Sequence, residues 1–293
     1  MAGVPLAVLP MYDWPEVRDA TDRLWACLRV ALRAAGFAAP EALDRAIAPW
    51  DAWRSPDLLL GQTCGLPFRR HLEGQVTLLG APDYGVEGCP PGHYRSVLVA
   101  RANDRRDGLT AFAGARLALN GEGSQSGLGA LVAAFAPDET GGGFFREALV
   151  TGAHRQSIVA IAEDRADIAA IDAISWRLAQ AHEPAARRLR VVGLTPPTPG
   201  LPFISAAGRD QAALAGAVER GLASLDDAAA RVLGIAGFAR FVAADYAVID
   251  PAVSLGDLVA RPAHPEVARP EVARPEVAHP EVASPEVERP EPA

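Results

Sequence analysis

The chain has 293 residues, a formal net charge of −8 and a hydrophobic fraction of 49%. This length suits one large domain or two lobes of ordinary size, with enough apolar residues for a sizeable core. The acidic balance argues against nucleic acid as a partner, because phosphate contacts need clusters of basic residues. No apolar run reaches the roughly 18 residues of a membrane-spanning helix. Three cysteines, Cys27, Cys64 and Cys89, are too few for a disulfide scaffold and lack metal-ligand spacing, so no metal and no cofactor is predicted.

Short apolar runs alternate with helical patterns along most of the chain. Strands are predicted at residues 4–9, 58–60, 76–79, 94–100, 115–119, 148–150, 167–171 and 189–194. Helices are predicted at residues 16–35, 40–48, 128–135, 155–163, 209–221, 226–233 and 236–244. This alternation is typical of an α/β protein with mostly parallel sheets. Ligands bind beyond the carboxyl ends of such strands, where the sequence places Tyr12, Thr63, Asn120, His154, Asp172 and Thr195.

The most informative stretch runs from Asn120 to Gly127, a polar loop rich in glycine and serine between a predicted strand and a predicted helix. Ser124 or Ser126 is a natural N-cap, and a helix N-terminus with free N–H groups favours an anion. The loop is neither a Walker A motif, since the chain has no lysine, nor the G-x-G-x-x-G dinucleotide fingerprint. It therefore indicates a site for a tetrahedral oxyanion, and an ordinary capped strand–turn–helix is the alternative.

Five segments taken together resemble the phosphate- and phosphonate-binding proteins of ABC transporters. They are the residues 9–13, 62–65, 120–127, 151–157 and 167–172, and the resemblance spans about residues 4–246. It implies a two-lobe, periplasmic-binding-protein-like fold of type II that closes on its ligand. The first lobe would comprise residues 1–97 and 194–260 and the second residues 98–193. The crossings between the lobes would lie at residues 94–100 and 189–194.

The same resemblance implies roles for individual residues. Ser124, Ser126 and Gly127 would hold the oxygens of a phosphate or phosphonate, and His154 would donate to the same anion. Asp172 matches an acid that meets the ligand's amine in aminophosphonate binders, and its alternative role is to cap the helix that follows. Tyr12 fits an aromatic wall, and Asn120 and Thr63 complete the predicted ligand-binding set.

The resemblance implies that the protein is a non-catalytic monomer that binds a small anion and feeds an ABC transporter permease. It also implies a periplasmic or cell-envelope location. The N-terminus has no basic region before its apolar run and is not a signal peptide as written, so a cytoplasmic location is the alternative. Two rival functions are an enzyme on the same scaffold, as in some menaquinone and thiamine-precursor pathways, and a cytoplasmic ligand sensor. Cys64 would be the nucleophile of the enzyme. In an exported protein, Cys64 and Cys89 would pair and Cys27 would stay free.

From about residue 261 the character of the chain changes. Arg-Pro-Glu-Val-Ala and close variants repeat every five residues to the end. Proline at this frequency is incompatible with a helix interior or a sheet ladder. Residues 261–293 are therefore predicted to be a disordered, extended tail of PEVA repeats.

Overall fold

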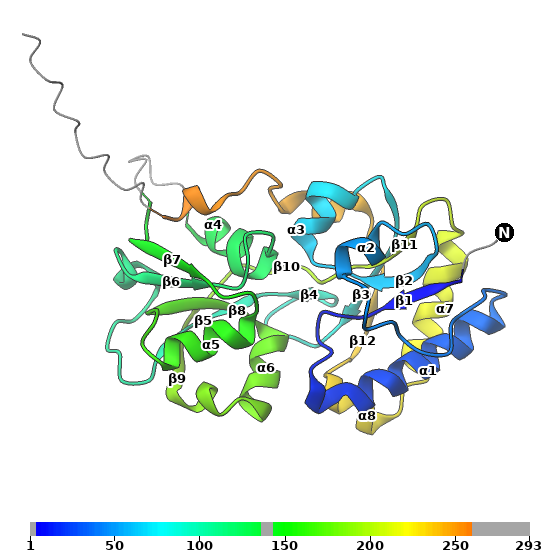
Figure 1. The fold of residues 1–293 in the computed structure, drawn as a ribbon, viewed down its shortest axis with the longest axis horizontal. Coiled ribbons are helices and arrows are strands. Elements are labelled where there is room, and N and C mark those ends of the chain that lie inside the picture. Colours follow the sequence, from blue (N-terminus) through cyan, green and yellow to red (C-terminus); the bar gives the residue numbers. More distant parts are fainter. Residues whose placement is uncertain (1–3, 136–142, 260–293) are drawn as a thin grey trace, which may run out of the picture. The chain divides into compact units, whose positions relative to one another are not determined.

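The computed structural model describes residues 4–135 and 143–259, which belong to one compact unit that ends at Arg261. The predicted tail of PEVA repeats, residues 261–293, lies outside the described residues. Two five-stranded sheets with their helices make up the described part (Figure 1). None of its helices is long and apolar enough to cross a membrane.

The first of these sheets, called here the N-terminal sheet, has the strand order β1-β2-β11-β3-β12. Its strands are β1 (Leu6–Val8), β2 (Leu58–Gln62), β3 (Val76–Asp83), β11 (Phe203–Ala206) and β12 (Gly237–Ala239). The helices of this part are α1 (Arg18–Ala34), α2 (Pro49–Trp53), α3 (Gly65–Pro67), α7 (Gln211–Ala223) and α8 (Asp227–Leu233). Helix α1 buries Leu24, Leu28 and Leu32 along one stripe, and α7 packs on it closely. A Cβ on Gly221 of α7 would lie 2.8 Å from the Leu28 Cα, so this close approach requires glycine.

The second sheet, called here the central sheet, has the strand order β7-β6-β8-β5-β9. Its strands are β5 (Ser96–Arg101), β6 (Arg116–Leu119), β7 (Glu147–Val150), β8 (Ile168–Asp172) and β9 (Leu189–Leu194). Its helices are α4 (Ala130–Ala134), α5 (His154–Ala162) and α6 (Ala173–His182). Every residue of β8 is buried, which explains why this strand is an unbroken apolar run up to Asp172.

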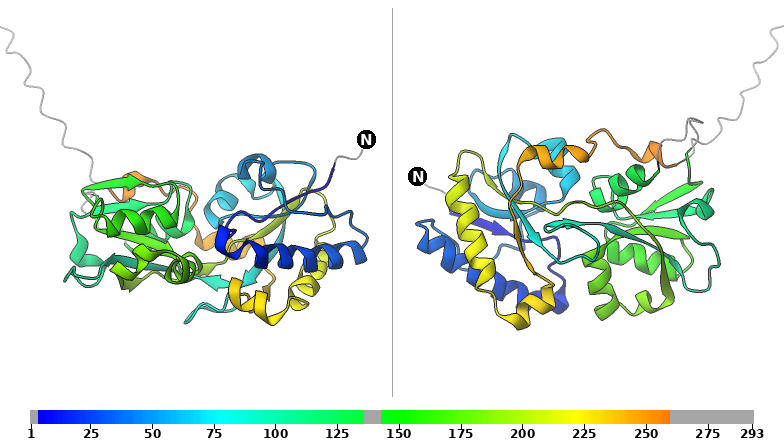
Figure 2. Two further views of the ribbon diagram at one scale, coloured as in Figure 1. Left: turned by 60° about the horizontal axis from the view of Figure 1, so that its bottom comes forward. Right: turned by 180° about the vertical axis from the view of Figure 1, so that it is seen from behind.

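Two chain segments pair with each other between the two sheets. Strand β4 (His93–Tyr94) and strand β10 (Thr198–Pro199) form a two-stranded antiparallel ladder (Figure 2). The predicted crossings at residues 94–100 and 189–194 therefore lie mostly inside the central sheet, as β5 and β9. Further along the chain, the Phe145 N–H donates to the Leu258 carbonyl at 2.8 Å, and Phe145 forms a bridge with Val259. The last described residues thus pack on the central sheet.

The prediction of mostly parallel sheets is wrong. Strand β11 runs antiparallel to β2 and β3, and β5 runs antiparallel to β8 and β9, so each sheet is mixed. The parallel pairs are β1 with β2, and β6 with both β7 and β8. Sequence patterns report which residues are buried, and they carry no information on strand direction.

Two predicted helices are also wrong. Residues 40–48 form bends, because the Asp44 carboxylate accepts from the N–H groups of Ala46 and Ile47 and competes with helix formation. The helix there begins later, as α2. Residues 237–239 form the edge strand β12, because antiparallel pairing with β3 outweighs local helix propensity. The predicted helix at residues 128–135 begins earlier, as a π-helical turn from Gln125 to Gly129 that leads into α4.

Candidate functional site

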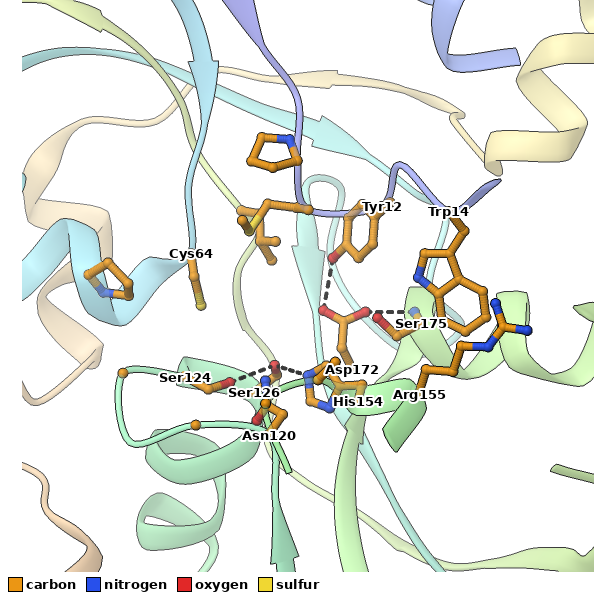
Figure 3. A pocket seen from close by; sticks show the side chains of 18 of the residues that line it. Tyr12, Trp14, Cys64, Asn120, Ser124, Ser126, His154, Arg155, Asp172 and Ser175 are labelled. Atoms are coloured by element: carbon orange, nitrogen blue, oxygen red, sulfur yellow. Dashed lines mark hydrogen bonds between the residues drawn. The ribbon is translucent and has the colours of Figure 1, made fainter. Parts of the chain in front are cut away.

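A cavity of about 370 Å³ lies where the N-terminal and central sheets face each other (Figure 3). Most of its lining residues lie at or just after the ends of β1, β2, β6, β7 and β8, and the others come from α2 and from Leu201, just before β11. The parallel strands of each sheet thus present their carboxyl ends to the same space, as the sequence predicts.

The loop after β6 supplies the hydroxyl groups of the cavity. Ser124 is the N-cap of the helical turn, and its Oγ accepts from the Gly127 N–H at 2.9 Å. The Ser126 Oγ lies 3.3 Å from the Ser124 Oγ and 2.8 Å from the His154 Nε2. Figure 3 shows these three side chains together on one side of the cavity, next to Asn120. The structure therefore brings together four of the predicted ligand-binding residues.

His154 is the first residue of α5 and reaches the serines from the loop after β7. Burial lowers the pKa of its ring from 6.5 to about 4, and the Ala170 backbone opposes this shift. The imidazole is therefore neutral near pH 7, with one N–H and one acceptor nitrogen. It offers an anion a hydrogen bond and no full positive charge.

Asp172 ends β8 and caps α6. Its Oδ1 accepts from the N–H groups of Ile174 and Ser175 at 2.8 and 3.0 Å, and its Oδ2 accepts from the Tyr12 hydroxyl at 2.8 Å. Burial raises the pKa of the carboxyl to about 6, against the lowering effect of these donors. Three donors already use most of the acceptor capacity of this carboxylate. The capping role is thus present, and little capacity is left for a ligand's amine.

Tyr12 connects the two sides of the cavity. It follows β1 of the N-terminal sheet, and its hydroxyl reaches Asp172 of the central sheet, while its ring meets Tyr84 edge-on at 5.2 Å. A second connection is made by Arg155, whose Nη1 lies 2.9 Å from Glu16 and whose Nε lies 2.8 Å from Glu183. Tyr12 therefore lines the cavity as predicted and also bridges it.

Two predicted site residues do not line the cavity. Thr63 is fully buried behind it. Gly127 is needed for packing, since a Cβ there would come within 2.0 Å of the Asn120 Oδ1. Its N–H is engaged by Ser124.

Several lining residues were not predicted. Trp14, Trp50, Trp53, Arg155 and Ser175 all face the cavity. Trp50 and Trp53 are three positions apart and directly follow Pro49, which starts α2. A proline at a helix start followed by two aromatic residues at helical spacing is a sequence signal that both side chains lie on one face of a short helix.

All three cysteines are free thiols, so the expected Cys64–Cys89 pair is absent. The Cys64 Sγ lines the cavity and accepts from the Gln125 N–H at 3.3 Å, whereas the Cys89 Sγ accepts from Arg95. Burial raises the pKa of the Cys64 thiol, which disfavours the thiolate that a nucleophile requires. Within residues 4–135 and 143–259, no group of three His, Cys, Asp or Glu side chains could hold a metal ion.

Two mixed sheets that face each other across a ligand-sized cavity define the two-lobe, periplasmic-binding-protein-like fold. PhnD1 from Prochlorococcus marinus in complex with methylphosphonate matches with a TM-score of 0.62 at 17% identity, covering 83% of this chain and 95% of that chain. XAC2383 from Xanthomonas citri bound to ATP matches with a TM-score of 0.60 at 16% identity, covering 83% and 93%. A binding protein component of an ABC phosphonate transporter from Pseudomonas aeruginosa, PA3383, matches at 0.57 and 14%, covering 83% and 84%. These likenesses confirm the predicted fold class.

The family model of ABC transporter, phosphonate, periplasmic substrate-binding proteins matches residues 63–248. The chain belongs to this family, as the five sequence segments predict. Its members are substrate-binding proteins of transporters and not enzymes, and the family is periplasmic. A search of curated proteins found no match to the chain.

Proposed function

We propose that the protein binds a single phosphorus oxyanion, a phosphonate or a phosphate, in the cavity and delivers it as a monomer to an ABC transporter permease. Ser124, Ser126 and His154 hold the oxygens, and Asn120 and Tyr12 complete the contact set. The observation that carries this proposal is the convergence of the Ser126 Oγ on the His154 Nε2, at 2.8 Å, beside the Ser124 Oγ. Methylphosphonate and ATP, which two similar structures contain, both carry phosphorus oxyanions.

In this proposal the anion is bound by neutral hydrogen-bond donors and not by a free positive charge. Among the described residues that line the cavity, Arg155 is the one arginine, and Glu16 and Glu183 already pair with it. Hydroxyl groups and a neutral imidazole would therefore carry the anion, because the amides of Gln125, Gly127, Leu128 and Gly129 already donate within the protein. Asp172 and Gly127 act as supports in this arrangement, and Thr63 lies behind it. In this proposal one lobe comprises residues 1–97 and 194–260, and the other lobe comprises residues 98–193.

Calorimetry with methylphosphonate and inorganic phosphate tests this assignment. Ser126→Ala should weaken binding by about 1–3 kcal/mol, because a charged acceptor loses a hydrogen-bond partner. Ser224→Ala is the matched control, since its hydroxyl bonds to the Gly221 carbonyl at the end of α7, outside the cavity lining. Unchanged affinity in a Ser124→Ala, Ser126→Ala double variant would rule out this loop as the anion site.

A further inference from the structure

One wall of the cavity is aromatic and apolar. Three of the chain's five tryptophans, Trp14, Trp50 and Trp53, lie on it, together with Met11 and Pro67. Trp50 and Trp53 meet edge-on, with ring centroids 5.1 Å apart. Trp50 keeps 38% of its surface exposed, a large apolar area for a side chain that lines a cavity. All of these residues come from the part of the chain that builds the N-terminal sheet.

The opposite wall is polar and comes from the central sheet. It carries the side chains of Asn120, Ser124, Ser126, His154 and Ser175. The charged groups on this wall are paired within the protein, Arg155 with Glu16 and Asp172 with the Tyr12 hydroxyl. The cavity therefore has one end suited to an oxyanion and another suited to an uncharged, flat group.

The size of the cavity exceeds what an inorganic oxyanion needs. At about 30 Å³ for each water-sized group, 370 Å³ has room for roughly a dozen such groups. Trp53 is buried and the Trp14 ring packs on the Arg155 guanidinium, so Trp50 is the tryptophan with most of its cavity surface uncovered. A single tetrahedral anion on the serines would leave that surface of Trp50 facing water, which forgoes the free energy of covering it. A ligand that fills the space must extend from the serines toward Trp50.

We propose that the preferred ligand is an organic phosphonate or phosphate monoester with an aromatic substituent, its anionic head on Ser124, Ser126 and His154 and its ring against the exposed part of Trp50. This inference rests on the proposed function and specifies its substrate class. A cationic substituent fits poorly, because Asp172 already accepts three hydrogen bonds from the protein. An aromatic ring instead gains edge-to-face or offset-stacked contacts with the Trp50 indole.

Calorimetry on the full chain with methylphosphonate, phenylphosphonate and phenyl phosphate tests the substrate class. We expect phenylphosphonate to bind at least about tenfold more tightly than methylphosphonate, a difference of about 1.4 kcal/mol. Trp50→Ala should weaken the binding of phenylphosphonate much more than that of methylphosphonate and so abolish most of this preference, because the ring of Trp50 contacts the substituent and not the head. Trp176→Phe is the control, since Trp176 packs in the core of the central sheet and does not line the cavity.

The possible results distinguish this inference on the substrate class from the proposed function, the binding of a phosphorus oxyanion. Methylphosphonate that binds as tightly as phenylphosphonate, or more tightly, would overturn the aromatic substrate class and leave the oxyanion function intact. A protein that binds neither phosphonate, nor phenyl phosphate, nor inorganic phosphate would overturn both. Preference for phenyl phosphate over phenylphosphonate would support the inference and identify the ligand as an ester.

Discussion

At the scale of single residues, the oxyanion loop is held in place from behind. The Ser96 Oγ of β5 donates to the Ser126 carbonyl at 2.8 Å, and the Ser96 N–H donates to the Thr195 Oγ1 at 2.9 Å. These groups are buried, so the bonds are shielded from competing water. The Ser126 hydroxyl is therefore positioned by β5 and the segment after β9 before any ligand contacts it, which reduces the entropy that binding must offset.

The pH dependence of stability should reveal two opposing groups in the cavity. Asp172 has a pKa raised from 3.8 to about 6, so its ionisation destabilises the fold as the pH rises from about 4 to 6. His154 has a pKa lowered from 6.5 to about 4, so its protonation destabilises the fold as the pH falls from about 6.5 to 4. The two contributions cancel in part over the same interval. Asp172→Asn should therefore make stability fall more steeply than in the wild type as the pH is lowered from 6.5 to 4.

Urea unfolding at several pH values measures this effect. His154→Gln should give the reverse of Asp172→Asn, a protein that gains stability relative to the wild type as the pH falls through the same interval. Each residue should account for at most about 3 kcal/mol, since one pKa unit corresponds to 1.36 kcal/mol. Parallel pH profiles for wild type and both variants would show that neither group titrates in that interval.

Sequence patterns identified the polar half of the site and not the aromatic half. The spacing and chemistry of a glycine–serine loop before a helix indicate Ser124 and Ser126, whereas His154 is indicated by its place after a predicted strand and by the family resemblance. Trp14 lies 36 positions before Trp50, and nothing local in the chain indicates that these two side chains line one cavity. Trp14 follows β1, whereas Trp50 and Trp53 lie in α2, which precedes β2 and is held to the end of that strand by the bond from the Trp53 Nε1 to the Gln62 carbonyl. The pairing of β1 with β2 therefore brings both segments to the cavity.

At the scale of secondary structure elements, burial explains both the correct predictions and the errors. Buried runs such as β8 and amphipathic patterns such as α1 are visible in sequence, since their periodicities differ. Strand β12 has only partly buried residues and is fixed by its pairing with β3, a non-local contact. The antiparallel pairing of β5 with β8 and β9 is likewise a non-local contact.

The segment that follows Tyr246 is an element that periodicity could not predict, because its structure comes from contacts with distant arginines. Arg70 donates to the carbonyls of Pro251 and Val253, and Arg69 donates to the Ile249 carbonyl. Leu258, 1% exposed, ends the segment in the core cluster that contains Phe145. The segment is thereby attached to both parts of the molecule.

Shortening Leu258 should destabilise this attachment. We expect Leu258→Ala to lower the free energy of unfolding by about 2–4 kcal/mol, the usual effect of removing a buried leucine side chain. Val248→Ala is the matched control, because Val248 is 67% exposed and should change stability by less than about 0.5 kcal/mol. Equal, small effects of the two substitutions in urea unfolding would mean that the end of the segment is not part of the core.

At the scale of the whole described part, several contacts join the two sides of the cavity. Among them are Tyr12 with Asp172, Glu16 with Arg155, Cys64 with the Gln125 N–H, and Arg70 with the Glu122 carbonyl. Arg177 of α6 adds two more, to the carbonyls of Tyr84 and Leu233. Trp14 adds a stacking contact, with the Arg155 guanidinium 4.6 Å from its ring centroid. These contacts characterise a closed form, because each requires both sides to be close. The short β4–β10 ladder is the natural place for a hinge, since few residues there need to change their backbone angles.

If the protein opens and closes about this ladder, weakening the bridging contacts should shift its population toward the open form. We expect a Tyr12→Phe, Glu16→Gln variant to have a larger radius of gyration than wild type in small-angle scattering without ligand. Saturating methylphosphonate should bring both proteins to the same smaller value, because the ligand gains contacts from both sides only in the closed form. The variant should also bind more weakly, in proportion to the reduced fraction of closed molecules.

Arg23→Gln is a suitable control that also removes a charge. The ion pair of Arg23 with Asp226 joins α1 to the start of α8 and does not cross the cavity. A radius of gyration that stays the same in variant and wild type, with and without ligand, would contradict hinge closure and leave a rigid cavity as the alternative.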